Sequence, residues 1–223
     1  VFPRLCSGCG QQSTSALAIC TDCQWHLPWI ENACRRCGLP TQTNDDWRDC
    51  VKCREKSLWF DRVCALFYYR SPIKQMITQL KFSSNLSSAQ GLGALFASKL
   101  QDHGYTQHNL PEVVLPMPLH KKRLRQRGYN QAHELSCGLL PFVQVNDRLC
   151  WRIKSTAAQS ELGKSARQKN MAGAFAVSPE ISRYNHVAIF DDVVTTGATA
   201  NALSYVLKQA GVEQVDVWFI CRR

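Results

Sequence analysis

The sequence contains no apolar run that approaches the roughly 20 residues a membrane-spanning helix needs, and it has no signal-peptide pattern. We therefore expect no membrane insertion and a cytoplasmic location. Low-complexity tracts are also absent, and an apolar content of 45% is ordinary for a globular protein. Acidic residues are few: 17 Asp and Glu accompany 27 Lys and Arg, for a formal net charge of +10. The 223 residues suffice for one α/β domain and a small additional module.

Cysteine, by contrast, is abundant, and eight of the twelve cysteines form four C-x-x-C pairs near the N-terminus. The pairs are Cys6/Cys9, Cys20/Cys23, Cys34/Cys37 and Cys50/Cys53. Thiolates two residues apart can chelate one tetrahedral zinc from a tight turn, and two such pairs complete the site. A disulfide framework or a redox C-x-x-C explains the repetition less well. We predict two structural zinc sites, formed by consecutive pairs, which is the simplest pattern, or by interleaved pairs.

We place the boundary of this zinc module near Phe60, giving a module over 1–60 and a second domain over 61–223. The module carries seven basic and six acidic side chains, whereas the second domain carries twenty and eleven. An electrostatic surface for nucleic acid is therefore expected mainly on the second domain. We interpret the tryptophans of the first 60 residues as packing around the zinc turns, His26 as a surface residue and the four remaining cysteines as buried apolar residues. These are Trp25, Trp29, Trp47 and Trp59, and Cys64, Cys137, Cys150 and Cys221.

The stretch over 186–199, H-V-A-I-F-D-D-V-V-T-T-G-A-T, predicts a phosphate site. Four consecutive apolar residues predict a buried strand that ends at Phe190, and helical periodicity begins at Ala198. In the turn between them, backbone amides and the helix dipole can receive an anion, and Gly197 lets the backbone approach it. Hydroxyl donors come from Thr195, Thr196 and Thr199.

Two carboxylates, Asp191 and Asp192, precede this turn and can accept hydrogen bonds from adjacent sugar hydroxyls. A phosphate at the turn and a diol at the acids together describe a ribose 5-phosphate. An ordinary β-turn-α connection with incidental acids is the alternative. A nucleotide P-loop fits poorly, because the turn lacks a Gly-Lys-Ser/Thr ending.

The most basic segment is Lys121–Arg127, with five cations in seven residues. A solvated loop is the ordinary explanation of such a run. This one follows a predicted buried strand, Glu112–Met117, and open α/β sheets bind ligands at the carboxyl ends of their strands. We therefore interpret it as a basic loop for pyrophosphate or a longer polyanion. Its cations are Lys121, Lys122, Arg123, Arg125 and Arg127, and a polar flap over 154–169 adds Lys164, Arg167 and Lys169. Tyr129 is placed either to stack on a base or to pack in the core.

Four segments together resemble the ComF/GntX family over essentially the whole chain. They are the cysteine module, P-M-P-L-H-K-K-R-L-R-Q-R-G-Y-N-Q-A, A-R-Q-K-N-M-A-G-A-F and the stretch over 186–199. The last of these also resembles the binding motif for 5-phosphoribosyl 1-pyrophosphate (PRPP) in type I phosphoribosyltransferases. The resemblance implies a type I phosphoribosyltransferase-like parallel sheet with flanking helices, preceded by the zinc module. It also implies PRPP on Thr195, Thr196, Gly197, Ala198 and Thr199, Asp191 and Asp192 in a catalytic site, and Mg²⁺ with PRPP.

The family is implicated in natural transformation, in which it helps to handle internalised single-stranded DNA. The resemblance thus implies single-stranded DNA and other competence proteins as partners. Two hypotheses remain open: an enzyme that transfers a phosphoribosyl group to an unknown acceptor, and a non-catalytic DNA-binding factor that retains a PRPP pocket. No acceptor pocket is visible in the sequence to separate them.

Overall fold

The computed structural model describes residues 5–13, 19–41, 49–54, 58–80, 86–154 and 173–223. Its centre is a parallel sheet with the strand order β1-β6-β5-β2. The strands are β1 (Arg62–Tyr68), β2 (Val113–Pro116), β5 (His186–Val194) and β6 (Gln214–Arg222). An antiparallel pair, β3 (Cys150–Arg152) and β4 (Phe175–Val177), accompanies the sheet. The predicted α/β class with a parallel sheet is confirmed.

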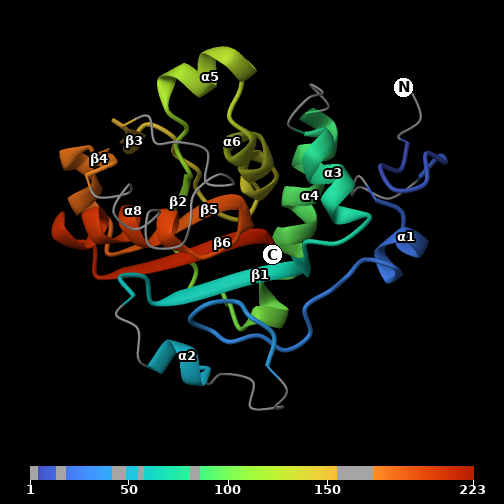
Figure 1. Cartoon of the computed structure of the whole chain (residues 1–223), viewed down its shortest axis with the longest axis horizontal. Helices are drawn as coiled ribbons and strands as arrows, with labels where there is room; N and C mark the ends of the chain where they lie inside the picture. The colour runs from blue at the N-terminus through green and yellow to red at the C-terminus, as the bar shows by residue number, and fades with distance from the viewer. Residues whose placement is uncertain (1–4, 14–18, 42–48, 55–57, 81–85, 155–172) are drawn as a thin grey trace.

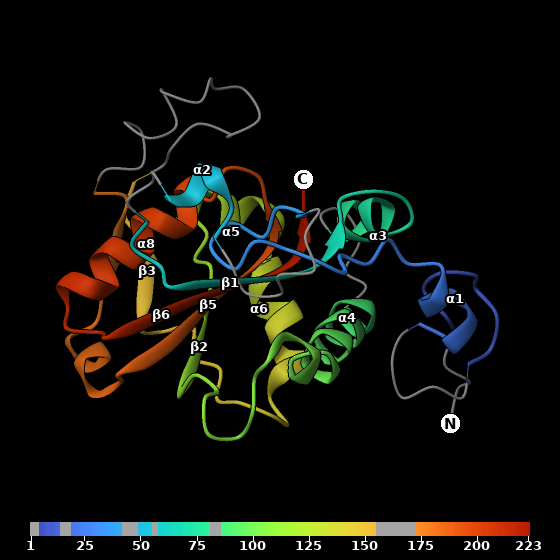
Figure 2. The same cartoon turned by 90° about the horizontal axis from the view of Figure 1, so that it is seen from below.

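Helices cover both faces of the sheet, because successive residues of each buried strand point to opposite sides. On one face, Ala188 and Phe190 of β5 join a core with α3 (Ile73–Gln79), α4 (Leu86–Ser98) and α6 (Gln131–Ser136). On the other face, Val187 and Ile189 pack with α8 (Ala198–Gln209). Figures 1 and 2 show these layers from two directions. The short helical segments are η1 (Gln101–His103), α5 (Lys121–Arg127), η2 (Cys137–Leu139) and η3 (Pro179–Arg183).

Helices α4 and α6 approach each other closely. A Cβ atom on Gly93 would lie 1.9 Å from the carbonyl oxygen of Leu135, so only glycine fits there. This contact locks α6 against α4, and α6 follows directly on the basic segment.

The N-terminal module forms two ribbons that contain α1 (Thr21–Trp25) and α2 (Val51–Arg54). Residues 28–35, which join them, run along the free edge of β1: Ile30 N donates to Leu66 O at 2.8 Å, and Tyr68 N donates to Pro28 O at 2.8 Å. This contact blunts an edge that would otherwise expose unpaired backbone groups. The ribbons are thus joined to the sheet by backbone hydrogen bonds.

The tryptophans of the module have different environments, so the prediction that all pack around the zinc turns is wrong for at least one. Trp25 is 80% exposed. Trp29 packs on Phe67 of β1, with ring centroids 4.5 Å apart, and Trp59 packs edge-on against Tyr205 of α8. Trp47 lies outside the described residues. Within the part of the chain that the structure describes, no helix is both long and apolar enough to cross a membrane.

Candidate functional site

The acidic pair lies inside β5 rather than after it. We expected the strand to end at Phe190, but the backbone continues to pair with β6, since Asp191 is opposite Phe219 and Val194 is opposite Arg222. β6 extends to Arg222 and supplies the partner for this extension. Asp191 Oδ1 accepts a hydrogen bond from Asp192 N at 2.9 Å. Both acids are half-buried at the carboxyl end of the sheet.

The turn after β5 has the features of an anion site. Gly197 adopts a left-handed backbone conformation with φ of +75°, as its place in the sequence predicts, and α8 begins at Ala198. Thr196 Oγ1 accepts a hydrogen bond from Ala198 N at 3.3 Å. A Cβ atom on Gly197 would lie 3.7 Å from the ring of Phe60, so the turn rests on the linker that follows the zinc module. Anions are stabilised at such a helix start by backbone N–H groups and the helix dipole.

Arg222 holds this turn in place, and the sequence analysis did not predict a role for it. Its Nη1 donates to the carbonyl oxygens of Val194, at 3.2 Å, and Thr195. Arg223 N donates to the same Val194 oxygen at 2.9 Å. Hydrogen bonds from a charged donor are strong, so the guanidinium holds the carbonyls of the turn in one conformation.

The basic segment is a helix, so the prediction of a loop is wrong. α5 spans Lys121–Arg127, with His120 as its N-cap: His120 Nδ1 accepts from Lys122 N at 3.2 Å. Gly128, with φ of +83°, ends it and donates to Leu124 O at 2.8 Å. Lys and Arg are good helix formers, and the two caps outweigh the repulsion between the cations.

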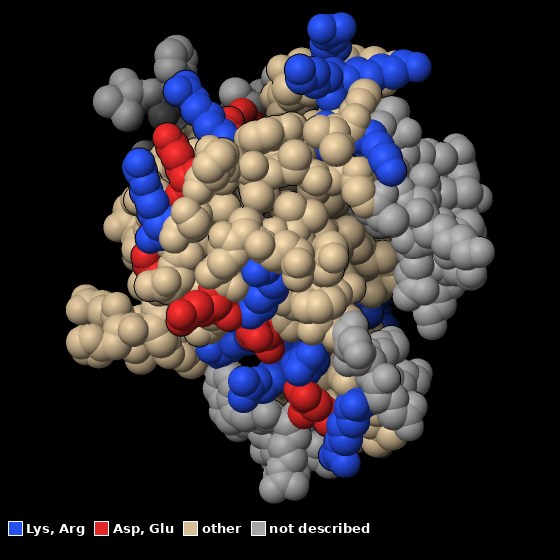
Figure 3. Space-filling view, turned by 90° about the vertical axis from the view of Figure 1, so that its left-hand side faces the viewer, with Lys and Arg blue, Asp and Glu red and all other residues tan. Residues whose placement is uncertain are grey.

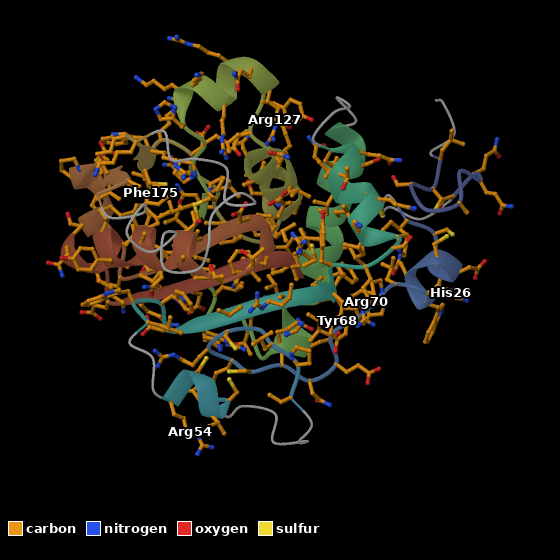
Figure 4. The ribbon with its side chains drawn as sticks, in the orientation of Figure 1. His26, Arg54, Tyr68, Arg70, Arg127 and Phe175 are labelled. Atoms are coloured by element: carbon orange, nitrogen blue, oxygen red, sulfur yellow. The ribbon has the colours of Figure 1, made fainter. Side chains whose placement is uncertain are left out.

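None of the residues of α5 is buried. Figure 3 shows Lys and Arg gathered at the top of one face of the molecule, where Figure 1 places α5. Arg127, at the end of α5 toward α6 (Figure 4), donates to Gln131 Oε1. The other cations of the segment give the molecule a positive end beside the carboxyl edge of the sheet.

Arg152 of β3 connects α5 to the acidic pair, which sequence reasoning missed. It is buried, and its guanidinium lies 5.6 Å from the ring centroid of Phe175. Burial and the charge of Arg123 lower the pKa of Arg152, while the carboxylate of Asp191 acts in the opposite direction. Arg123 of α5 and Asp191 of β5 are therefore both close enough to Arg152 to influence its charge.

The predicted binding surface also included Tyr129 and the cations of the flap. The hydroxyl of Tyr129 donates to the carbonyl of Leu80 at the end of α3, and the side chain is half-buried. Of the two roles left open, this contact favours packing. The flap cations Lys164, Arg167 and Lys169 lie outside the described residues.

The eight paired cysteines form two groups from consecutive pairs, so the interleaved arrangement is wrong. Within each group the potential ligand atoms lie within 4.8 Å of one another. The groups are Cys6, Cys9, Cys20 and Cys23 in the first ribbon, and Cys34, Cys37, Cys50 and Cys53 in the second. The Sγ atoms of Cys9 and Cys20 are 3.9 Å apart, and those of Cys37 and Cys50 are 3.8 Å apart. Tetrahedral zinc with bonds of about 2.3 Å to sulfur requires about 3.8 Å, so both groups fit zinc.

Of the four unpaired cysteines, Cys64, Cys150 and Cys221 are buried as predicted, whereas Cys137 is half-exposed. His26 is exposed and belongs to neither cysteine group, as expected of a surface residue.

Comparison with known proteins agrees with this architecture. A family model described as a double zinc ribbon domain matches residues 1–54. Competence protein F of Haemophilus influenzae is 32% identical over 223 residues, covering 98% of this chain and 90% of its own. The chain belongs to the ComF family. DNA utilization protein YhgH of Escherichia coli K12 is 30% identical over 207 residues, covering 92% and 90% of the two chains. Competence protein ComFC of Bacillus subtilis is 25% identical over 202 residues, covering 86% and 79%.

Proposed function

We propose that this protein binds PRPP at the carboxyl edge of its sheet and acts in natural transformation, where it handles internalised single-stranded DNA. The names of its relatives, competence protein F, competence protein ComFC and DNA utilization protein YhgH, support the cellular role. The observation that carries the pocket is the sequence of two acids, a left-handed Gly197 and a helix start.

Each part of PRPP has a chemical counterpart at this edge. The amides at the start of α8, with Thr195, Thr196 and Thr199, suit the 5-phosphate. Asp191 and Asp192 suit the ribose hydroxyls, which donate to carboxylate oxygens. Arg152 and the cations of α5 suit the pyrophosphate, because guanidinium groups bind phosphoryl oxygens with two parallel hydrogen bonds. Mg²⁺, when bound, would supply positive charge that stabilises the leaving pyrophosphate, and the carboxylates at this edge are the oxygen donors that would hold it.

As an enzyme, the protein would transfer the phosphoribosyl group to an acceptor that the fold does not identify. The bond between ribose C1 and the pyrophosphate oxygen breaks, and pyrophosphate leaves with the electron pair. A nucleophilic atom of the acceptor forms the new bond to C1 and gives its proton to solvent. Asp191 and Asp192 would stabilise the positive charge that develops on the ring, so positioning and electrostatics supply the rate.

Calorimetry with fragments of PRPP tests the pocket. We expect PRPP with Mg²⁺ to bind more tightly than ribose 5-phosphate or pyrophosphate alone, since it uses both halves. Gly197→Ala should weaken the binding of ribose 5-phosphate about tenfold or more, because a side chain at positive φ costs about 1–3 kcal/mol. The same change should leave the affinity for pyrophosphate unaltered. Gly211→Ala is the control: Gly211 has φ of +98° in open space after α8. Absence of ribose 5-phosphate binding to the wild type would refute the assignment. Pyrophosphate release with candidate acceptors then separates enzyme from binding factor.

The exposed cations of α5 favour a second activity, binding of single-stranded DNA. Each cation that neutralises a strand phosphate contributes about 0.7 to the salt slope, so Lys122→Ala/Arg123→Ala/Arg127→Ala should flatten it by about two units. Fluorescence anisotropy of a labelled oligonucleotide at several salt concentrations measures this. Arg35→Ala/Arg54→Ala, on the exposed surface of the ribbons, is the comparison. If that variant loses DNA binding while the α5 variant retains it, the ribbons bind the DNA instead.

A further inference from the structure

Arg222 joins the phosphate-binding turn to the second zinc ribbon. Only 8% of its surface is exposed, and its Nη1 binds the carbonyls of Val194 and Thr195. On its other side lies the ribbon: a Cβ atom on Gly38 would be 3.9 Å from Arg222 Cδ. Gly38 directly follows the zinc ligand Cys37. The Arg222 side chain thus bonds the turn through its guanidinium and passes close to the ribbon with its aliphatic part.

The charge of Arg222 requires a negative partner, and within the described residues no carboxylate forms an ion pair with it. Its Nε is buried and has no hydrogen-bond acceptor in the same set. Burial lowers the pKa of Arg222, and Cys37 and Cys53, once deprotonated, act in the opposite direction. A zinc ion bound by four thiolates leaves the ribbon with about −2 charge beside the guanidinium. The loaded second site would therefore supply negative charge close to Arg222.

A second connection runs parallel to this one through the linker that leaves the second ribbon. Trp59 N donates to Asn201 Oδ1 of α8 at 2.7 Å, and Phe60 packs beneath Gly197. The first ribbon has different neighbours: Ser7 bonds Ser88 of α4, and Cys6 belongs to the core on the α3 and α4 face. Among the described residues, the second ribbon and its linker lie against the turn and those of the first ribbon do not, which makes the first ribbon a natural control.

We propose that the zinc-loaded second ribbon positions the phosphate-binding turn through Arg222, so that occupancy of this metal site sets the affinity of the pocket for a phosphorylated ribose. The identity of the ligand rests on the proposed function, whereas the link between metal and turn does not. Arg222 is a positioning residue in this scheme, since it acts on the carbonyl side of the turn and the ligand on the amide side.

Matched cysteine variants test the link in the full-length protein. Cys37→Ser and Cys9→Ser each remove one ligand, from the second and first sites respectively, and metal analysis reports the zinc lost from each. Hydrogen exchange of the peptide containing Thr195–Thr199 is then measured without ligand, and PRPP affinity by calorimetry. We expect Cys37→Ser to speed hydrogen exchange in the turn and to weaken PRPP binding by about 5- to 150-fold, the usual range of coupling between two sites. Cys9→Ser should change neither by more than about twofold.

Arg222→Lys tests the same link with both zinc sites intact, in case Cys37→Ser unfolds its ribbon. A lysine keeps the charge but loses the planar guanidinium that bonds the carbonyls of the turn. We expect faster exchange in the turn, weaker PRPP binding and zinc content equal to wild type. Arg223→Lys, at the exposed neighbouring position, should behave as wild type.

Coupling between two sites is reciprocal, so if zinc in the second site strengthens PRPP binding, PRPP must strengthen zinc binding at that site. PRPP should slow release of zinc from the second site to a chelator and leave the first unaffected. If the rate of hydrogen exchange in the turn is unchanged in both Cys37→Ser and Arg222→Lys, the proposal is overturned. If PRPP fails to bind the wild type but exchange responds as expected, the proposed ligand is wrong and the link stands.

Discussion

Both ends of the parallel sheet carry acidic residues, but the surroundings of these residues differ between the two ends. At the amino end, Asp216 of β6 has no solvent exposure. It accepts hydrogen bonds from the Tyr105 hydroxyl at 2.8 Å, His186 Nε2 at 3.1 Å and Gln214 Nε2 at 3.3 Å. Trp218 Nε1 in turn donates to the Tyr105 hydroxyl at 2.8 Å. This carboxylate is enclosed by protein donors.

At the carboxyl end, Asp191 and Asp192 are half-buried and precede the turn that we propose as an anion site, on the same side of the sheet as the positive helix α5. A buried acid with its lone pairs occupied by the protein stabilises the fold, whereas an accessible acid next to opposite charge can meet a ligand. The comparison assigns stability to the amino end and binding to the carboxyl end. The predictions below test that division, beginning with the largest effect.

Asp216→Ala should cause the greatest loss of stability. Each buried donor left without an acceptor costs about 1–3 kcal/mol, and this change strands the buried hydroxyl of Tyr105 and the part-buried imidazole of His186. We expect the free energy of unfolding of the zinc-loaded protein to fall by about 3 kcal/mol or more, as measured by urea denaturation. Asp191→Ala, the matched change at the other end, should cost less than about 1 kcal/mol. Equal losses would remove the distinction between the two ends.

Tyr105→Phe should give an intermediate loss of about 1–2 kcal/mol near neutral pH, because it deletes the hydrogen bonds to Asp216 and Trp218. Tyr205→Phe, at a residue that is 45% exposed, should change stability by less than about 0.5 kcal/mol. Urea denaturation of both variants measures the difference.

The same tyrosine predicts a loss of stability at high pH. Burial and the charge of Asp216 raise the pKa of Tyr105 well above its ordinary value. The unfolded chain releases this proton near pH 10 while the folded chain keeps it, so the contribution is complete below pH 10 and decreases as pH rises further. Between pH 9 and 11, the unfolding free energy should decline more steeply in the wild type than in Tyr105→Phe. Parallel declines would show that Tyr105 does not contribute.

Arg152→Lys should affect binding more than stability. The charges of Arg123 and Asp191 both act on Arg152, and we propose that its guanidinium binds the pyrophosphate. Lysine keeps the charge but loses the bidentate geometry, so we expect pyrophosphate affinity to fall about tenfold. Calorimetry with pyrophosphate measures this change. Unaltered pyrophosphate binding, with ribose 5-phosphate weakened instead, would place Arg152 on the other half of the pocket.

The features predicted from sequence are those encoded by local spacing. Four C-x-x-C pairs at regular intervals predict two zinc sites, consecutive apolar residues predict the buried strands, and Gly197 before a helical pattern predicts the turn. Features that depend on distant partners were missed or misjudged. β5 extends past Phe190 because β6 is there to pair with it. Arg152 and Arg222 are buried by elements remote in the sequence, although Arg residues ordinarily indicate surface. The prediction of a loop in place of α5 was wrong because it relied on the density of charge and not on the residues that cap the helix.

The most direct test of this division is the PRPP affinity of the Asp191→Asn/Asp192→Asn variant, measured by calorimetry with Mg²⁺ on zinc-loaded protein. Asparagine preserves the shape of both side chains and removes their charge. We expect no measurable PRPP binding, together with an unfolding free energy within about 1 kcal/mol of the wild type. PRPP binding at wild-type affinity would contradict the assignment of the pocket to the carboxyl end of the sheet.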